Sequence, residues 1–97
     1  MEILKFEYQA NHLLQQRAHV GVVGSGDLEV LIEPAPGPTA IVRVRTSVGG
    51  FGEVWKSVLD RFFARFDFAA HVEINDFGAT PGMVTLRLEQ AAEEVQS

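Results

Sequence analysis

One hydroxyl group stands out among the side chains that could take part in chemistry. Ser25 lies in the stretch VVGSGDLEV, residues 22–30, where two apolar runs meet at a Gly-Ser-Gly-Asp break. Gly24 and Gly26 flank the serine, so no neighbouring side chain shields its hydroxyl, and another protein could approach this backbone closely. This presentation suits covalent modification. It does not suit a self-activated nucleophile, because no His or Lys lies close beside Ser25 in sequence to act as its base.

The same break also has a purely structural interpretation. Ser, Gly and Asp are ordinary turn residues, and glycine readily supplies the positive φ that short hairpins need. Residues 17–23 and 28–32 each alternate apolar side chains on one face, which predicts a β-hairpin with Ser25 at its tip. The pattern alone therefore leaves open whether Ser25 is a turn residue or a hydroxyl presented for modification.

Further segments predict the body that would hold this hairpin. Apolar side chains spaced by three and one residues from Phe51 to Phe66 predict an amphipathic helix of about four turns. Alternation predicts about six strands in all, at residues 2–8, 17–23, 28–32, 40–45, 71–76 and 83–89. We therefore expect an α+β fold in which a mostly antiparallel sheet packs against one long helix in two layers.

Length and composition limit the classes of function. The 97 residues fit one domain, 1–97, with residues 90–97 as a frayed or disordered tail. A net charge of −5 argues against binding of nucleic acid or an anionic membrane by electrostatics alone. The chain has no cysteine, which excludes thiolate chemistry, and no transmembrane-length or signal-peptide-like run. We expect a cytoplasmic protein.

Other residues that could do chemistry favour ordinary surface roles. The histidines lack the spacing of a metal site, and no metal site is predicted. They are His12, His19 and His71. The carboxylates of Glu73, Asp76 and Asp27 show no arrangement that demands acid–base work, so no catalytic residue is predicted.

Two further stretches have a weaker functional alternative. The glycine-rich VGGFG, residues 48–52, favours a loop that turns Phe51 inward, with phosphate contact at the helix start as the alternative. Arg43 and Arg45, joined by Arg17 if its strand lies beside theirs, favour a solvated face balanced by Glu29 and Glu33. The alternative is a docking patch for an acidic partner.

Four stretches, at the same order and spacing over nearly the whole chain, resemble one known family. They are RAHVGVVGSGDLEVLIEP (17–34), VRVRTSVGGFGEVW (42–55), LDRFFARF (59–66) and EINDFGATPGMVTLRLEQAAEE (73–94). The chain resembles the acyl carrier, or delta, subunit of bacterial biotin-independent malonate decarboxylase. The expected fold differs from that of ordinary acyl carriers. Those are four-helix bundles whose modified serine lies in an Asp-Ser-Leu motif at the start of a helix.

The resemblance implies that Ser25 carries a covalent prosthetic group. The group would be 2'-(5''-phosphoribosyl)-3'-dephospho-CoA, joined through a phosphodiester, with Gly24, Gly26 and Asp27 completing the hairpin tip. Its thiol would carry acetyl and malonyl while malonate is converted to acetate and CO2. The implied partners are the acyltransferase and decarboxylase subunits, a prosthetic-group transferase and a malonyl transferase. The chain itself would be a non-catalytic carrier.

Two other hypotheses remain beside the carrier. In the first, the chain is a non-catalytic interaction module whose unmodified hairpin docks a partner protein, so that Ser25→Ala would be nearly silent. In the second, it is a small enzyme, which would need a base or metal site that the sequence does not indicate.

Overall fold

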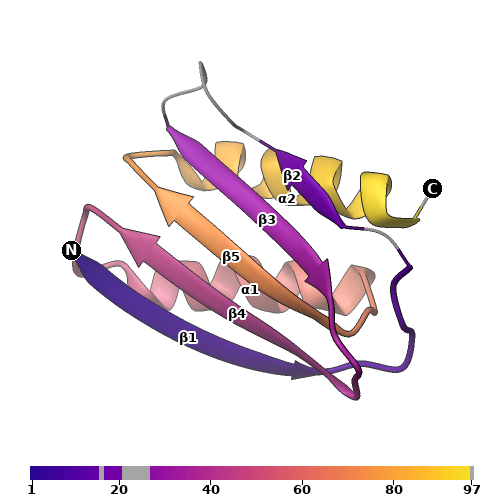
Figure 1. Cartoon of the computed structure of the whole chain (residues 1–97). Helices are drawn as coiled ribbons and strands as arrows, with labels where there is room; N and C mark the ends of the chain where they lie inside the picture. Colours follow the sequence, from indigo (N-terminus) through magenta and orange to yellow (C-terminus); the bar gives the residue numbers. More distant parts are fainter. Residues whose placement is uncertain (16, 21–26, 97) are drawn as a thin grey trace.

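The computed structural model describes residues 1–15, 17–20 and 27–96, and its strands form one five-stranded sheet (Figure 1). In spatial order the strands are β1, β4, β5, β3 and β2. Their bounds are β1 Glu2–Gln9, β2 Ala18–Val20, β3 Leu28–Pro34, β4 Thr39–Thr46 and β5 Ala70–Asp76. The two helices are α1, Gly52–Arg65, between β4 and β5, and α2, Pro81–Gln96, after β5.

The sheet is mixed. β4 and β5 are parallel neighbours at its centre, whereas β1–β4, β3–β5 and β2–β3 are antiparallel pairs. Parallel strands cannot be joined by a tight turn, and α1 provides the longer connection that this pair requires. The β2–β3 pair, with Val20 opposite Val30 and Ala18 opposite Ile32, confirms the predicted hairpin pairing of these two segments.

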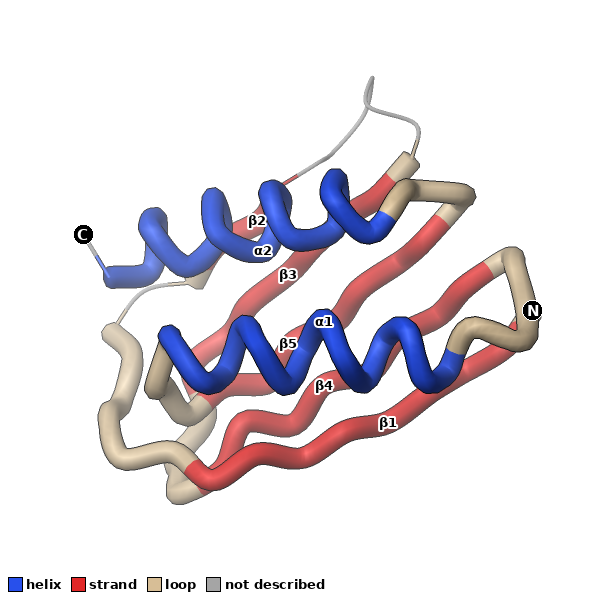
Figure 2. The backbone as a smooth tube through the Cα atoms, turned by 180° about the vertical axis from the view of Figure 1, so that it is seen from behind, coloured by secondary structure: helices blue, strands red, loops and turns tan. Residues whose placement is uncertain are grey.

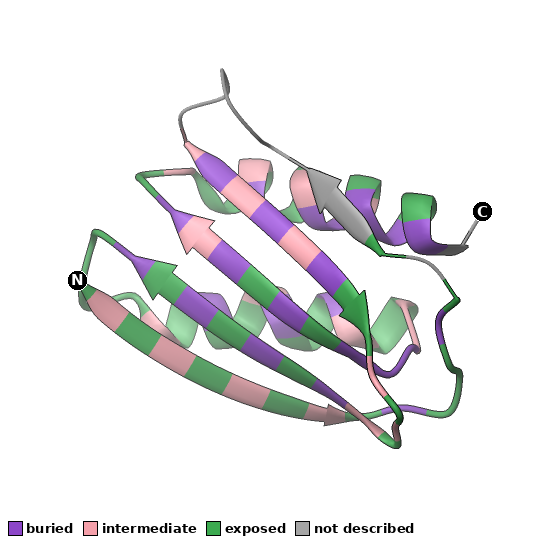
Figure 3. Ribbon diagram, viewed as in Figure 1, coloured by how far each residue is buried: buried purple, intermediate pink, exposed green. Residues whose placement is uncertain are grey.

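Both helices lie side by side on one face of the sheet, and the other face is open (Figure 2). Burial alternates along the strands for this reason (Figure 3). In β4, Val42 and Val44 are fully buried beneath the helices, whereas Arg43 and Arg45 between and beyond them are exposed. The two-layer arrangement therefore follows directly from the period-two pattern of the strands.

The predicted stripe of α1 supplies much of the core. Trp55, Leu59 and Phe62 are buried by the sheet, and Phe62 packs its ring against that of Phe66 with centroids 4.8 Å apart. Burial of side chains this large contributes about 1.5–3 kcal/mol each. Phe51 and Val54 depart from the predicted buried stripe, because they are 48% and 42% exposed near the start of the helix.

The prediction of six strands and one long helix is wrong, although the α+β class holds. Residues 83–89 belong to α2, and the sheet has five strands. The alternation of Val84, Leu86 and Leu88 suggested a strand, but Leu86 is 46% exposed while the other two are buried. The buried positions instead follow the helical spacing, at Val84, Leu88, Ala91, Ala92 and Val95.

Residues 90–96, expected to be frayed or disordered, continue α2 in the structure. Ala91, Ala92 and Val95 are at most 5% exposed, so this last part of α2 contributes to the core. No helix in the described ranges is long and apolar enough to cross a membrane.

Candidate functional site

Of the residues in the predicted site, the structure describes Asp27, which lies at one end of the sheet, where β3 begins and β4 and β5 end (Figure 1). Ser25, Gly24 and Gly26 lie outside the described residues. Asp27, the fourth predicted residue, comes directly before β3. Leu28, the first residue of that strand, is 1% exposed, so the chain is anchored in the core one residue after Asp27.

The backbone of Asp27 is fixed by the loop between β5 and α2. The amide of Phe77 donates a hydrogen bond of 2.8 Å to the Asp27 carbonyl. Asp27 lies next to the Leu28–Asp76 pair of the β3–β5 ladder, so this bond extends the ladder beyond the ends of both strands. The exit of the hairpin from the sheet is therefore set by the loop that follows β5.

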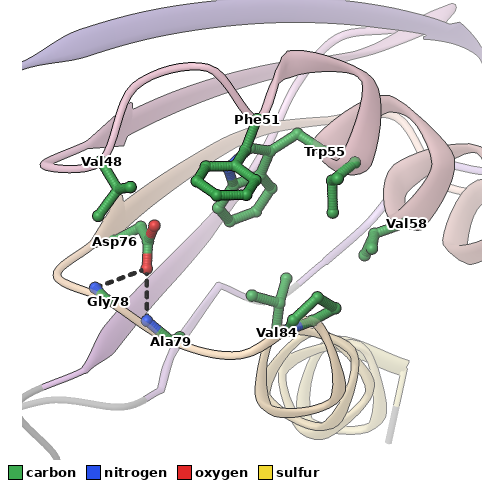
Figure 4. Close-up of a pocket in the computed structure, with 10 residues that line it drawn as sticks. Val48, Phe51, Trp55, Val58, Asp76, Gly78, Ala79 and Val84 are labelled. Atoms are coloured by element: carbon green, nitrogen blue, oxygen red, sulfur yellow. Dashed lines mark hydrogen bonds between the residues drawn. The ribbon is translucent and has the colours of Figure 1, made fainter.

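A buried carboxylate holds that loop in shape. Asp76 is 6% exposed, and its Oδ1 accepts hydrogen bonds from the amides of Gly78 and Ala79 at 3.0 and 2.9 Å (Figure 4). Its Oδ2 accepts the Thr46 hydroxyl at 2.8 Å, which ties the end of β5 to the end of β4. Gly78 has φ of +114°, a conformation that side chains rarely adopt. Asp76 therefore has a structural role in this turn.

Arg87 of α2 reaches the carboxylate of Asp27. Arg87 Nη2 lies 3.7 Å from Asp27 Oδ1, too far for a hydrogen bond but close enough for an ion pair. The side chains are 21% and 30% exposed. Arg87 Nε and Asp27 Oδ1 are buried, and neither has a hydrogen-bond partner among the residues that the structure describes. This pair leaves hydrogen-bonding capacity at the base of the hairpin unused.

An apolar cavity of about 320 Å³ opens at the same end, between the start of α1 and the start of α2 (Figure 4). Valine, phenylalanine and tryptophan side chains line most of it, among them Phe51, Trp55 and Val84. Asp76 is the one titratable residue in its lining, and both carboxylate oxygens already accept hydrogen bonds in the turn. The lining offers no pair of groups for acid–base chemistry.

The structure separates the other carboxylates and the histidines. Glu73 lies on the open face of the sheet, whereas Asp76 is buried on the helix side. His71 is exposed on the open face. His12 Nδ1 lies 3.5 Å from Asp67 Oδ2, near the end of the sheet where β5 begins. His19 is in β2, where side chains are not described. Within the described ranges, no three metal-ligating side chains gather.

The predicted arginine cluster does not form as a trio. Arg43 and Arg45 are exposed on β4, which is separated from β2 by β5 and β3. Arg17, directly before β2, therefore does not lie in a strand beside them. Glu73 is opposite Arg43 in the register, so β5 supplies the acidic neighbour that was expected from Glu29 and Glu33 of β3.

The sequence prediction missed Arg87, because a strand over residues 83–89 places it on the face opposite the apolar Val84, Leu86 and Leu88. Two signals could have revealed the helix. Thr80 followed by Pro81 is a typical helix start, and the Thr80 hydroxyl indeed accepts the amide of Met83 at 3.2 Å. The apolar spacing also runs unbroken from Val84 to Val95.

Comparison with known proteins identifies the family. The family model described as "Malonate decarboxylase delta subunit (MdcD)" matches residues 15–95. The chain belongs to the malonate decarboxylase delta subunit family. The match spans the β2–β3 hairpin, the helices and the whole β5–α2 region, so it includes the Asp27–Arg87 pair.

Relatives of this delta subunit family are similar over their full length. The malonate decarboxylase acyl carrier protein of Azotobacter vinelandii is 54% identical over 98 residues, covering 100% of this chain and 99% of the relative. The protein of the same name from Pseudomonas aeruginosa is 54% identical over 95 residues, covering 97% and 96%. A chain in the crystal structure of a Pseudomonas malonate decarboxylase hetero-tetramer in complex with malonate is 48% identical, with a TM-score of 0.90, over 98% of this chain and 99% of that chain.

Proposed function

We propose that this chain is the acyl carrier subunit of a malonate decarboxylase, with Ser25 as the residue that is covalently modified. The observation that carries the proposal is the match to the delta subunit family over residues 15–95, which includes the whole hairpin segment. The register of that hairpin supports the choice of serine. Ser25 follows Val20 by five positions and precedes its partner Val30 by five, so it is the midpoint of the connection.

The proposed group is 2'-(5''-phosphoribosyl)-3'-dephospho-CoA, attached to the Ser25 oxygen through a phosphodiester, with Gly24, Gly26 and Asp27 around it. When bound, this group supplies the thiol that carries acetyl and malonyl. The surroundings fit an anionic linkage, because the buried Nε of Arg87 has no partner in the described part of the chain and lies by the base of the hairpin.

The contribution of the chain itself is to anchor the arm. The Asp76 turn, the Phe77–Asp27 hydrogen bond and the buried Leu28 fix where the hairpin leaves the body. A fixed root holds a tethered thiol at a high effective concentration for more than one partner site. We propose that these sites belong to acyltransferase and decarboxylase subunits, that two transferases load the group and its first malonyl, and that the chain has no active site of its own. The cytoplasmic location stays a prediction from the sequence.

The experiment is an intact-mass measurement of the chain co-expressed with its genomic neighbours, beside the chain expressed alone. We expect the co-expressed chain to be heavier by one phosphoribosyl-dephospho-CoA unit, with peptide mapping to Ser25. Ser25→Ala should abolish the increment while its unfolding curve stays that of the wild type. Ser57→Ala, which alters an exposed serine of α1, is the matched control and should be modified fully.

Two results would contradict the proposal. Mass addition to Ser25→Ala would place the modification elsewhere. Bare masses for every sample, with a modifying system shown to be active on a relative, would leave Ser25 as a turn residue and favour the unmodified docking hairpin.

A further inference from the structure

Arg87 is positioned unlike the other arginines whose surroundings the structure describes. Arg65 pairs with Glu89, Arg61 donates to the Ser57 hydroxyl at 3.2 Å, and Arg43 lies on the open face of the sheet. Arg87 instead extends from α2 to the base of the hairpin, where its guanidinium is largely buried beside Asp27. Among the cationic side chains that the structure describes, Arg87 is therefore the one beside Asp27, the residue that joins the hairpin connection to β3.

The contact between Arg87 and Asp27 is incomplete. At 3.7 Å, their charges attract each other, but no hydrogen bond joins them, and Arg87 Nε and Asp27 Oδ1 have no other partner in the described ranges. Buried polar atoms are normally paired, because leaving one unpaired costs about 1–3 kcal/mol. Asp27 therefore holds the guanidinium of Arg87 in place by charge, and the Nε–H donor stays free to bind an anion.

Covalent geometry limits how far a group on Ser25 can be from this guanidinium. Two residues of fully extended chain span about 7 Å, so the Cα atom of Ser25 lies within that distance of Asp27 whatever the path between them. This limit allows a phosphate on the serine oxygen to meet the guanidinium of Arg87, a long side chain that already contacts Asp27. The planar guanidinium can donate two parallel hydrogen bonds to the two free oxygens of a phosphodiester.

We infer that Arg87 binds the phosphodiester that links Ser25 to its prosthetic group, and that Asp27 keeps Arg87 in position until the group is attached. The inference rests on the proposed function. Attachment brings a second negative charge to the base of the hairpin, and the phosphate then competes with Asp27 for the same guanidinium. The Nε–H that has no partner in the described part of the chain gains one, so Arg87 is a binding residue and Asp27 a positioning residue.

The test compares the modified and unmodified chain by NMR, with intact mass read on every sample. We expect the Arg87 Nε–H resonance to shift and its hydrogen exchange to slow on modification. The ³¹P resonance of the phosphodiester should differ between the wild type and Arg87→Met. Arg43→Met removes the same charge from the open face of the sheet and should leave the ³¹P resonance as in the wild type.

Thermal unfolding gives a second readout, independent of decarboxylase activity. Modification should raise the Tm of the wild type by about 6–12 °C, the shift expected for one charge-assisted hydrogen bond in a domain of this size. Arg87→Met should lose this gain and Arg43→Met should keep it. Arg87→Lys, which keeps the charge without the two-pronged geometry, should retain part of it and serves if Arg87→Met fails to fold.

The outcomes separate this inference from the function on which it rests. A bare mass at Ser25 in the wild type contradicts the carrier function itself. A modified Ser25 with an unchanged Arg87 Nε–H resonance, and an equal Tm gain in Arg87→Lys or Arg87→Met and the wild type, overturns the role of Arg87 and leaves the carrier function intact.

Discussion

The hydroxyl of Thr46 is a side-chain contact that joins the ends of the two central strands, beside the backbone hydrogen bond from Ser47 to the Asp76 carbonyl. It is 1% exposed, donates to Asp76 Oδ2 at 2.8 Å and accepts the amide of Val48 at 3.1 Å. Thr46→Val keeps the shape and removes both bonds, leaving a buried carboxylate oxygen and an amide short of a partner. We expect a loss of about 1–3 kcal/mol in the free energy of unfolding, measured by urea denaturation.

Thr39→Val makes the same change at the other end of β4, at a partly exposed position. The difference between the two variants isolates the hydroxyl of Thr46 from the general effect of threonine-to-valine substitution in a strand. If Thr46→Val unfolded no more easily than Thr39→Val, the turn at Asp76 would not depend on this contact.

Prediction from sequence at this scale depends on signals that are local in the chain. The glycines beside Ser25 are visible in the sequence, whereas the role of Asp76 depends on Thr46, which lies 30 residues away. Arg87 meets Asp27 only because α2 packs against β3. Spacing within one segment carries no information on contacts of that kind, so the sequence offered Asp27 as a turn residue and did not indicate its partner.

At the scale of elements, α2 offers a direct test of helix against strand. Leu88 is fully buried and Leu86 is 46% exposed, although both would share one face of the strand that alternation predicted. We expect Leu88→Ala to lower the free energy of unfolding by about 2–5 kcal/mol. Leu86→Ala should change it by less than about 0.5 kcal/mol, because an exposed helix position tolerates alanine well. Equal losses in the two variants would contradict the helix.

The contrast between α1 and α2 shows what periodicity can decide. In α1 the apolar stripe is long and rich in aromatic residues, and it does not fit the alternation of a strand. The sequence therefore predicts only a helix there. In α2, residues 83–89 alternate as a strand would, and the small residues Ala91 and Ala92, which continue the helical spacing, fall in the segment predicted as a tail. Small side chains give a weak signal in sequence, yet they are fully buried here because α2 lies close to the sheet.

For the whole molecule, the strand order was beyond sequence reasoning. The parallel pair β4–β5 depends on α1 crossing one face of the sheet, and the antiparallel partner of β5 comes from β3, about 40 residues earlier in the chain. Burial of both helices on one face selects this arrangement, and it is a property of the assembled layers. The same packing brings the start of β3 and the loop after β5 together at the hairpin base.

The stability of the molecule should fall in acid through two exposed carboxylates. The hydrogen bond from Lys56, followed by that from Tyr8, lowers the pKa of Asp60, and the backbone amide of Asn11 lowers the pKa of Asp67. Because the pKa of each carboxyl is lower in the folded state, its ionised form stabilises the fold. This contribution to the free energy of unfolding is complete above the pKa of the unfolded chain, about 3.9, and is lost as the pH falls below that value. We therefore expect the free energy of unfolding to decline between pH 5 and 3, measured by urea titration at each pH. Asp60→Asn and Asp67→Asn should each reduce this decline, and Glu7→Gln, at an exposed position of β1, should not.

Salt separates the two contributions, because they differ in physical origin. Asp60 is paired with the charged Lys56 at 2.7 Å, whereas Asp67 accepts mainly from the neutral amide groups of Asn11, at 2.7 and 3.1 Å. At about 1 M salt the Debye length falls to about 3 Å, so the part due to the exposed ion pair is screened. The effect of Asp60→Asn on the pH dependence should then shrink, while that of Asp67→Asn persists. Equal loss of both effects in salt would show that long-range charge, and not the hydrogen bonds of Asn11, stabilises the ionised form of Asp67.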